Sequence, residues 1–321
     1  MTIEEIKAVL PPPIAARVGS VRLADGVATI VADASGLARD RAAGLQFEIE
    51  ALVGALPGVS QVRVALMADK VHRRVVVVGS GKGGVGKSTL TANLAVALAR
   101  AGRKVGVVDA DIYGPSQPML LGASDAKPTA EGQTLIPVRS PHGVTMLSMG
   151  QIVAPGKAIA WRGPMTGNAL GQLMDAAWGE AELLLVDLPP GTGDVQLTML
   201  QKFKPDGAIV VSTPQDLALI DATRALDLFR QSQVPIIGLV ENMAGYVCPH
   251  CGELSDPFGE GGVEAAAQVM GETFLGRVPL SMEVRRASDA GTPPAAHDGA
   301  PGEAFVAIAA RLGQWLDKAA A

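Results

Sequence analysis

This sequence is poor in cysteine, in aromatic residues and in excess charge of either sign. Its 321 residues include two cysteines and 3% aromatic residues, and its 27 basic residues stand against 32 acidic ones, a formal net charge of −5. Two cysteines do not build a disulfide framework, and basic residues form no cluster that would attract nucleic acid. The sequence therefore argues against a disulfide-rich scaffold and predicts no nucleic-acid partner.

Long apolar runs are also missing. Although 48% of the residues are hydrophobic, no uninterrupted apolar stretch approaches the ~18 residues of a membrane-spanning helix. The first residues, MTIEEIKAVLPPP, contain acidic side chains and lack the apolar core of a signal peptide. We therefore expect a globular, cytoplasmic protein that has no membrane partner.

What the sequence does contain is a glycine-rich loop, GSGKGGVGKST, at residues 79–89. The spacing from Gly81 to Gly86-Lys87-Ser88 is that of a phosphate-binding loop. Glycines let successive backbone N–H groups turn inward around phosphate oxygens. Lys87 brings a positive charge to the β- and γ-phosphates, and the Ser88 hydroxyl is the expected protein ligand of Mg²⁺. The loop predicts a nucleoside triphosphate bound with Mg²⁺ through Gly81, Lys82, Gly83, Gly84, Val85, Gly86, Lys87, Ser88 and Thr89.

The segments on either side of this loop fit the same interpretation. Residues 73–78, RRVVVV, predict a buried strand, and residues 88–100 have the apolar spacing of a helix. A strand, a glycine loop and a helix N-terminus together form an anion-binding site. The second lysine of the loop, Lys82, indicates a branch of P-loop proteins in which two subunits close face to face around the nucleotide.

The chain is expected to divide near residue 70. Residues 1–68 predict a small α+β domain with a hairpin at Asp25-Gly26, and residues 69–72 predict a linker. Strands and helices then alternate through residues 73–321, which predicts an α/β domain with a mostly parallel, doubly wound sheet. A surface loop is expected at residues 122–133. The strands expected in the larger domain are residues 73–78, 104–108, 143–149, 183–186, 208–212, 236–240 and 273–278.

Two acidic motifs directly follow predicted strands of this domain. The motif VDAD places Asp109 and Asp111 at the end of one strand, and LLLVDLPPGTGD places Asp187 at the end of another. An aspartate in this position lies beside the phosphate loop and holds Mg²⁺, usually through water, and we assign that role to Asp187. A helix N-cap or a turn is the alternative role for each aspartate. The glycines of residues 187–194 predict a loop that moves with the state of the γ-phosphate.

The two cysteines form a C-x-x-C pair, Cys248 and Cys251. Such a pair supplies two thiolates to one metal centre, whereas a tetrahedral zinc or a four-iron cluster usually needs four ligands. Two chains that meet at a two-fold axis would complete the site, and Lys82 independently indicates a dimer. The alternatives are a zinc knuckle completed by His250 or a partner, a redox dithiol and inert structural thiols. Thiolates suit both zinc and iron, so this chemistry alone leaves the metal open.

Residues 73–292 resemble the Mrp/ApbC group of P-loop ATPases, relatives of MinD, ParA and nitrogenase iron protein. The matching segments are GSGKGGVGKST (79–89), VDADIYGPS (108–116), WRGPM (161–165), VDLPPGTGD (186–194), STPQDLALIDATRALDLF (212–229), VENMAGYVCPHCG (240–252), FGEGG (258–262) and VRRASDAG (284–291). The resemblance implies a slow, switch-type ATP hydrolase that works as a homodimer. It also implies a [4Fe–4S] cluster that bridges two subunits through Cys248 and Cys251. The cluster would come from cluster-assembly proteins and pass to apo iron–sulfur proteins.

The resemblance also implies roles for individual residues. Lys82 resembles a lysine that reaches the partner's nucleotide, and Asp111 resembles the residue that positions the attacking water. Together with Lys87 they are the expected catalytic residues. Asp109 and Asp187 are expected near Mg²⁺. Asn242 is expected to read the edge of the adenine, with loop capping as its alternative role.

Residues 1–68 resemble the small MIP18-type domain found before some Mrp proteins. The match departs at Pro11-Pro12-Pro13, where that domain has an acidic Asp-Pro-Glu turn, and residues 33–41 contain no cysteine. We therefore interpret this domain as a docking or structural module.

Two other classes of protein share parts of this pattern. A partitioning or positioning ATPase like ParA or MinD would act on DNA or on a membrane, but residues 303–321 mix acidic with basic side chains and do not favour a membrane anchor. A metal-insertion chaperone would keep the dimer and the ATPase and would carry nickel or zinc. Metal analysis separates that chaperone from a cluster carrier.

Overall fold

The computed structural model describes residues 3–34, 37, 39–67, 73–152, 163–248 and 250–319. Two compact units, residues 1–72 and 73–321, make up the chain, and each has its own sheet and hydrophobic core. The predicted linker at 69–72 lies outside the described residues, as do Trp161 and Arg162 of the WRGPM segment.

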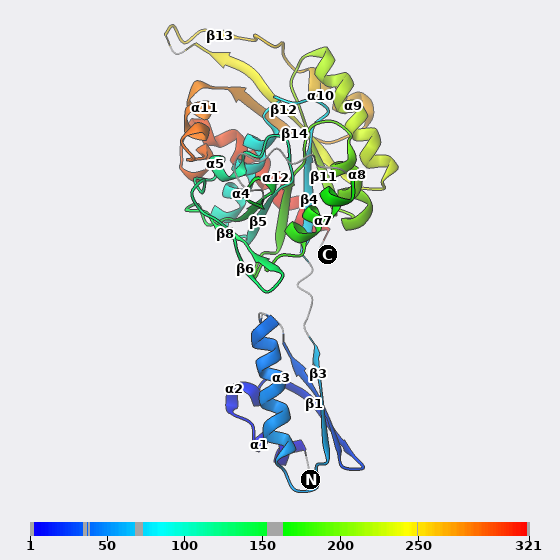
Figure 1. Ribbon diagram of the computed structural model, residues 1–321. Helices are drawn as coiled ribbons and strands as arrows, with labels where there is room; N and C mark the ends of the chain where they lie inside the picture. The colour runs from blue at the N-terminus through cyan, green and yellow to red at the C-terminus, as the bar shows by residue number, and fades with distance from the viewer. Residues whose placement is uncertain are drawn as a thin grey trace. The chain divides into compact units, whose positions relative to one another are not determined.

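The smaller unit is a three-stranded sheet in the order β1-β2-β3 (Figure 1). β1 and β2 are antiparallel, and Asp25 and Gly26 between them both take positive φ, 50° and 75°, as a two-residue hairpin turn requires. β3 pairs parallel with β2, and α3 connects the two strands. Ile30 and Ile49 are fully buried between sheet and helix. The elements are α1 (Ile3–Ala8), α2 (Pro12–Ala15), β1 (Val18–Ala24), β2 (Val27–Asp33), α3 (Arg39–Gly54) and β3 (Gln61–Met67).

The larger unit is built on a nine-stranded sheet in which the central strands are all parallel. Its order is β13-β12-β11-β4-β10-β5-β9-β8, with β14 paired to β12, and only β8 and β13 run antiparallel to their neighbours. The predicted α/β fold with a mostly parallel sheet is confirmed. The strands are β4 (Arg74–Gly79), β5 (Val105–Asp109), β8 (Val138–Arg139), β9 (Thr145–Ser148), β10 (Leu183–Asp187), β11 (Gly207–Ser212), β12 (Ile236–Val247), β13 (Leu254–Ser255) and β14 (Phe274–Leu280).

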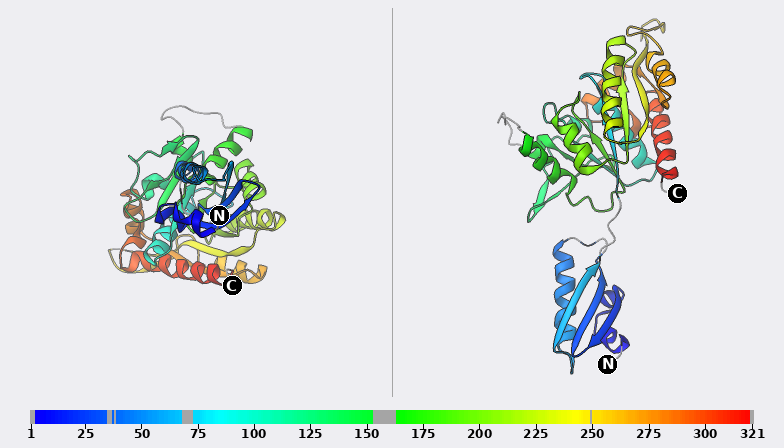
Figure 2. Two further views of the ribbon diagram at one scale, coloured as in Figure 1. Left: turned by 90° about the horizontal axis from the view of Figure 1, so that it is seen from below. Right: turned by 90° about the vertical axis from the view of Figure 1, so that its right-hand side faces the viewer.

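Helices cover both faces of this sheet. In β4, Val76 and Val78 enter one core with α4 and α12, and Val77 enters the other with α7 and α9, because successive strand residues point to opposite faces. Figure 2 shows the strands between α9 and α12. The helices are α4 (Lys87–Arg100), α5 (Gln117–Leu120), α6 (Met149–Ile152), α7 (Gly163–Met174), α8 (Asp194–Thr198), the π-helix η1 (Met199–Phe203), α9 (Asp216–Gln231), α10 (Gly262–Met270), α11 (Met282–Asp289), the 3₁₀-helix η2 (Pro294–Ala296) and α12 (Ala300–Lys318).

None of the helices in the described part of the chain has both the length and the apolar character needed to cross a membrane.

Two segments differ from the sequence-based expectation. The expected surface loop at 122–133 contains β6 (Thr129–Glu131), which pairs with β7 (Thr134–Ile136). Neither strand has a buried residue, so the sequence shows no alternation of apolar and polar residues that would predict a strand. β12 was expected to end at Val240 but continues to Val247. Its final residues pair with β13 in a hairpin whose side chains are mostly not buried, so an apolar run could not reveal them.

The parallel register brings the predicted motifs to one edge of the sheet. Asp187 at the end of β10 lies opposite Val78 of β4 on one side and Asp109 of β5 on the other. The glycine loop begins directly after β4. The carboxyl ends of parallel strands are where open α/β sheets bind ligands, so this edge is where a site is expected.

A glycine inside the core offers a test of this packing. A Cβ added at Gly106 of β5 would lie 2.7 Å from a Leu184 methyl and 2.7 Å from the Trp178 ring. We expect Gly106→Ala to destabilise the protein by about 1–3 kcal/mol through overpacking, as measured by urea unfolding. Gly44→Ala is the control, because a Cβ there meets nothing within 4 Å and alanine favours a helix by about 0.5–1 kcal/mol over glycine. Equal stabilities of the two variants would contradict the described packing.

Candidate functional site

A cavity of about 320 Å³ lies at the carboxyl edge of the sheet. Its wall is formed by the glycine loop and by residues from the two loops that follow β5 and β10. The structure therefore brings the predicted loop residues together with Asp111. The lining residues are Ser80, Lys82, Gly83, Gly84, Val85, Gly86, Lys87, Ser88, Thr89, Asp111, Gly114 and Pro190.

Close contacts explain two glycines of the loop. A Cβ at Gly81 would lie 1.9 Å from the Asp221 carbonyl oxygen of α9. A Cβ at Gly86 would lie 2.0 Å from Asn242 Nδ2, and Gly86 has a φ of +83° that side chains disfavour. Asn242 Nδ2 donates a hydrogen bond of 2.7 Å to the Val85 carbonyl. The loop is thus wedged between α9 and β12.

Lys87 and Asp187 form a buried ion pair in this structure. Lys87 begins α4, and its side chain is 6% exposed, whereas that of Asp187 is fully buried. The Lys87 ammonium contacts Asp187 Oδ1 and also lies 3.3 Å from the Ser88 hydroxyl. The charge of the loop lysine is therefore held by the carboxylate at the end of β10.

Asp109 is the second buried carboxylate of the site. Its oxygens accept hydrogen bonds from the backbone of Asp111, Ser116 and Gln117 and from the Ser148 hydroxyl, at 2.9–3.2 Å. Burial, followed by the charge of Asp187, raises the pKa of Asp109 to about 7, although the hydrogen bonds from Gln117, Ser148 and Asp111 lower it. Asp109 therefore organises the loop after β5 instead of facing the cavity.

Asp111 and Lys82 are placed differently. Asp111 lines the cavity and accepts hydrogen bonds of 3.1 Å from the backbone N–H groups of Tyr113 and Gly114, which fix its carboxylate. Lys82 also lines the cavity, but its side chain is exposed and makes no ion pair within the described residues. Lys82 is thus free to reach a group outside its own chain.

Sequence reasoning missed two glutamines of the site. Gln117 Nε2 donates to the Ser88 carbonyl at 3.0 Å and to Asp187 Oδ2 at 2.9 Å. Gln196 Nε2 donates to the carbonyls of Pro189, Pro190 and Gly191, at 2.7–3.1 Å, and so holds the loop after β10. A single glutamine in a sequence gives no signal of this kind, because its partners are fixed only by the fold.

The oxygen donors at this edge fit a magnesium ion. Mg²⁺ prefers hard oxygen ligands and usually takes one or two from the protein and the rest from phosphates and water. The Ser88 hydroxyl and the Asp187 carboxylate both lie beside the Lys87 ammonium. No group of three or more His, Cys, Asp or Glu side chains is arranged to hold a metal in the described ranges. The cation would therefore take most of its ligands from the nucleotide's phosphates and from water.

A larger cavity, of about 630 Å³, adjoins the first and shares Gly86, Ser88 and Thr89 with it. Its other walls come from the end of β12, from residues 279–281 and from α11. Asn242 and Tyr246 of β12 line it, with an apolar surface from Met119, Leu280 and Met282. A mostly apolar cavity beside a phosphate loop suits a nucleoside. Asn242 lines this cavity and donates its amide N–H to the loop backbone, and its expected contact with the adenine edge stays a prediction.

The cysteine pair lies in the hairpin between β12 and β13, shown in Figure 1 at the end of the yellow strand. The Cys248 N–H donates to the Glu253 carbonyl at 2.9 Å, and the Gly252 N–H donates to the Cys248 carbonyl at 2.8 Å. Cys248 is half-buried and Cys251 is exposed. Hydrogen bonds from the Cys251 backbone, the His250 backbone and the Cys251 thiol lower the pKa of Cys248. These contacts favour a thiolate, the form that binds metal.

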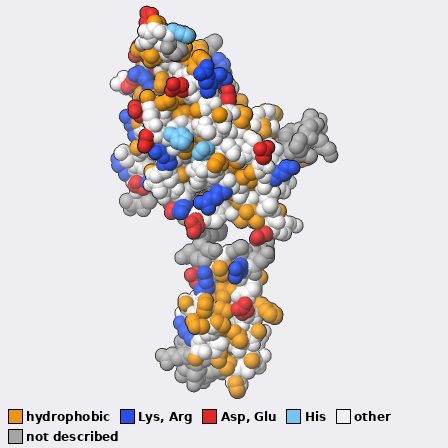
Figure 3. Space-filling view, turned by 90° about the vertical axis from the view of Figure 1, so that its left-hand side faces the viewer, with side chains coloured by type: hydrophobic (Ala, Val, Ile, Leu, Met, Phe, Trp, Pro, Cys, Tyr) orange, Lys and Arg blue, Asp and Glu red, His pale blue; other side chains and the backbone are white. Residues whose placement is uncertain are grey.

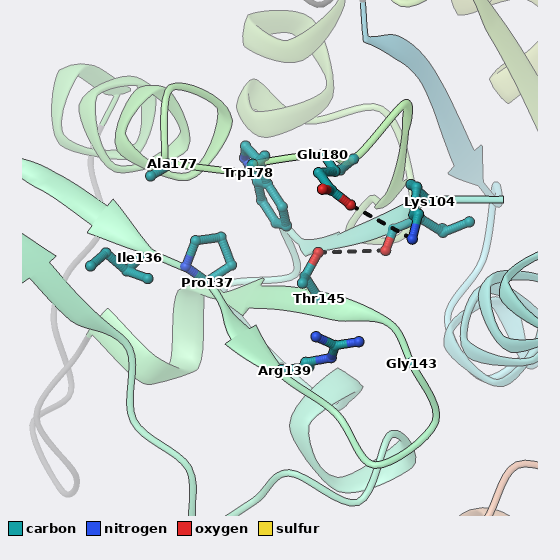
Figure 4. A pocket seen from close by; sticks show the side chains of 12 residues that line it. Lys104, Ile136, Pro137, Arg139, Gly143, Thr145, Ala177, Trp178 and Glu180 are labelled. Carbon is teal, nitrogen blue, oxygen red and sulfur yellow. Dashed lines mark hydrogen bonds and ion pairs between the residues drawn. The ribbon is translucent and has the colours of Figure 1, made fainter. Parts of the chain in front are cut away.

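Another cavity, of about 380 Å³, lies at the opposite edge of the sheet, where β5, β9 and β10 begin. Figure 4 shows the Trp178 ring among the side chains that line it, together with Lys104 and Glu180, which pair at 3.6 Å. Both charged side chains are exposed, so their pairing contributes little. This cavity lacks the phosphate loop and the buried carboxylates, and it does not belong to the nucleotide site.

The phosphate loop, the carboxylates at the strand ends and the parallel sheet define a P-loop nucleoside triphosphatase. Residues 71–312 match the model of the ParA family described as NUBPL iron-transfer P-loop NTPase, and the chain belongs to this family. The resemblance to Mrp/ApbC-type ATPases and the prediction of an ATP hydrolase are confirmed.

Three known proteins illustrate this membership. An iron–sulfur cluster carrier protein from Deinococcus radiodurans is 46% identical over 262 residues, which are 78% of this chain and 73% of that protein. A protein of the same name from Methanocaldococcus jannaschii is 44% identical over 247 residues, 76% of this chain and 85% of that one. A nucleotide-binding protein from Archaeoglobus fulgidus, solved with ADP, has a TM-score of 0.62 at 37% identity and covers 72% of this chain and 90% of its own.

The same fold occurs in the septum site-determining protein MinD of Pyrococcus horikoshii, solved with Mg-ADP. Its TM-score is 0.58, it covers 76% of this chain and 97% of its own, and its identity is 23%. At that identity the likeness concerns the fold alone.

The raised pKa of Asp109 predicts a distinctive pH dependence of stability. The folded protein holds this proton up to about pH 7, whereas the unfolded chain releases it near the ordinary value of 3.8. The folded state therefore binds more protons between these values, and its free energy of unfolding falls as the pH rises through that window. Relative to the wild type, nucleotide-free Asp109→Asn should show a smaller decline, measured by urea unfolding from pH 4.5 to 8. Parallel profiles for the two proteins would contradict the assignment.

Proposed function

We propose that this chain is an ATP-dependent carrier that holds a [4Fe–4S] cluster between two copies of itself and passes the cluster to apo iron–sulfur proteins. The observation that carries the proposal is the continuity of β12. Asn242 of this strand contacts the phosphate loop, and Cys248 follows the end of the same strand. The names of the Deinococcus and Methanocaldococcus relatives support the cargo. Cluster-assembly proteins would be the donors.

Two features favour sharing of the cluster by two chains. Each chain supplies two cysteines, and no third ligand joins them within the described residues. A four-iron cluster usually needs four ligands. Exposed apolar side chains, Val247 at 59% and Leu254 at 66%, flank the cysteines on the two strands of the hairpin. Burial of these side chains against a second copy would stabilise the shared site.

ATP would bind across the two adjoining cavities. Its phosphates would lie in the glycine loop, where Lys87 exchanges its pairing with Asp187 for the β- and γ-phosphates. Ser88 and Asp187 would hold Mg²⁺, the latter through water. When bound, the ion supplies charge neutralisation for the phosphates. Asp111, fixed by two backbone N–H groups, would orient the attacking water.

Closure of the dimer would add the last catalytic group. Lys82 is exposed and would reach the partner's phosphates, where a cation stabilises the charge that develops in the transition state. Hydrolysis would then release the loops at 109–116 and 187–194. Residues of both loops line the cavity with the glycine loop, whose Val85 carbonyl accepts from Asn242 of β12. Cluster stability would therefore follow the nucleotide state.

A basic surface would favour the alternative of a partitioning ATPase acting on DNA. Over the face drawn in Figure 3, Lys and Arg side chains are interspersed with Asp and Glu. That face offers no field of a single sign to attract nucleic acid. The cysteine hairpin also has no role in such a protein.

Cysteine substitutions test the cargo and its site directly. After anaerobic reconstitution with iron and sulfide, native mass spectrometry should detect one four-iron cluster per wild-type dimer. Cys248→Ala and Cys251→Ala should each abolish the cluster, because two ligands would be lost from every dimer. The control is His250→Ala, which removes the side chain between the two cysteines and should retain the cluster.

One cluster per monomer would overturn the shared site. Zinc retained in place of iron, and lost in His250→Ala, would support a zinc knuckle instead.

Mixing two inactive variants tests whether Lys82 acts across the dimer. Lys82→Ala and Asp111→Asn should each lower ATP turnover by at least about 100-fold, with ATP affinity changed less than about threefold. In a mixed dimer, the nucleotide site of the Lys82→Ala subunit keeps its own Asp111 and receives Lys82 from its partner. An equal mixture should therefore recover about a quarter of wild-type turnover, because half of the dimers are mixed and each has one working site. Failure to recover turnover would show that Lys82 acts within its own chain.

A further inference from the structure

Gln117 connects three parts of the nucleotide site. It is the first residue of α5 and is fully buried. Its backbone N–H donates to Asp109 Oδ2 at 3.1 Å. Its side-chain Nε2 donates to the Ser88 carbonyl at 3.0 Å and to Asp187 Oδ2 at 2.9 Å. The residue therefore joins the end of β5, the start of α4 and the end of β10.

The orientation of the Gln117 amide is fixed by its partners. Both groups that face Nε2, a backbone carbonyl and a carboxylate oxygen, can only accept hydrogen bonds while Asp187 is paired with the Lys87 ammonium. Turning the amide over would place its oxygen against two other oxygens. The observed orientation is therefore the one that the surrounding acceptors require.

This orientation leaves the other half of the amide unpaired. Gln117 Oε1 is buried and has no hydrogen-bond partner among the residues that the structure describes. A buried acceptor without a partner costs about 1–3 kcal/mol. A leucine or methionine would fill similar space without that penalty, so packing alone does not explain a glutamine here.

The two carboxylate oxygens of Asp187 bind different partners. Oδ1 pairs with the Lys87 ammonium, and Oδ2 accepts from Gln117. If Lys87 turned to the phosphates, Gln117 would still hold Oδ2, and Oδ1 would become available without loss of the carboxylate's orientation.

We propose that Gln117 is a positioning residue for the divalent cation of the nucleotide site. Its amide N–H₂ group holds Asp187 Oδ2 and the Ser88 carbonyl at the start of α4, so the carboxylate keeps its orientation when Lys87 leaves Oδ1. This inference rests on the proposed role of Asp187 at Mg²⁺. Partners of this kind behind a metal ligand typically change metal affinity by 10–100-fold.

The test measures cation binding separately from turnover. Full-length protein would be saturated with ADP, and Mn²⁺ would be titrated as the probe, with free Mn²⁺ measured by electron paramagnetic resonance. Gln117→Met keeps the side-chain length and removes both polar groups. It should raise the Mn²⁺ dissociation constant by about 10–100-fold, whereas ADP affinity in the presence of a chelator should change less than about twofold. Gln117→Leu is a second variant that should behave in the same way.

Asn93→Leu is the matched control. Asn93 is another buried amide, on α4, and it bonds the Thr89 carbonyl and the Ala295 N–H without touching Asp187. Its replacement should lower stability and leave Mn²⁺ affinity within about twofold of the wild type, since only the amide at 117 contacts the metal-side carboxylate.

Asp187→Asn tests the role of Asp187 at the cation separately from the positioning role of Gln117. It should weaken Mn²⁺ binding at least as much as Gln117→Met. If Asp187→Asn weakens binding and both Gln117 variants bind Mn²⁺ like the wild type, then Gln117 only cross-links the fold and the inference is wrong. If Asp187→Asn itself binds Mn²⁺ normally, the cation role of Asp187 fails, and that of Gln117 fails with it.

Discussion

The buried ion pair between Lys87 and Asp187 is the interaction on which the larger unit's site depends. Two charges withdrawn from water cost several kcal/mol each unless they are paired and hydrogen-bonded. Asp187 meets this requirement with Lys87 on one oxygen and Gln117 on the other. Its charge also raises the pKa of Asp109, which in turn orders the backbone after β5. Under the proposed function, a nucleotide's phosphates would compete for Lys87. Binding would then rearrange a hydrogen-bond network that joins the ends of β5, β9 and β10.

The glycine loop is also joined to β12, the strand that leads to the cysteines. Asn242 holds the loop carbonyl of Val85, and the strand then changes register between Asn242 and Tyr246, where Met243 and Gly245 take positive φ of 61° and 75°. Positive φ is uncommon for a residue such as Met243. The register change separates the part of β12 that lies within the sheet from the hairpin that carries Cys248.

Much of this arrangement could be predicted from the sequence, and the missing part has a physical reason. The phosphate loop at residues 79–89 and the acidic site residue Asp187 could be predicted, because glycine spacing and an acid after an apolar run are local sequence signals. Parallel pairing then places them together. The roles of Gln117 and Gln196 could not be predicted from the sequence, because the fold determines their partners. Gln117, for example, bonds Asp187, a residue 70 positions away. The hairpin end of β12 was missed because it has no buried face to impose alternation.

The central claim is that the nucleotide state controls the cluster held by the hairpin. The most direct measurement is the rate of cluster transfer from the reconstituted dimer to an apo iron–sulfur acceptor, followed by the acceptor's own spectrum, with ATP, with ADP and without nucleotide. The account predicts different rates in the three states, because each leaves Lys87, Asp187 and the loops around β12 differently paired. The same rate in all three states would contradict it and would leave a cluster carrier and an ATPase that share a chain without coupling.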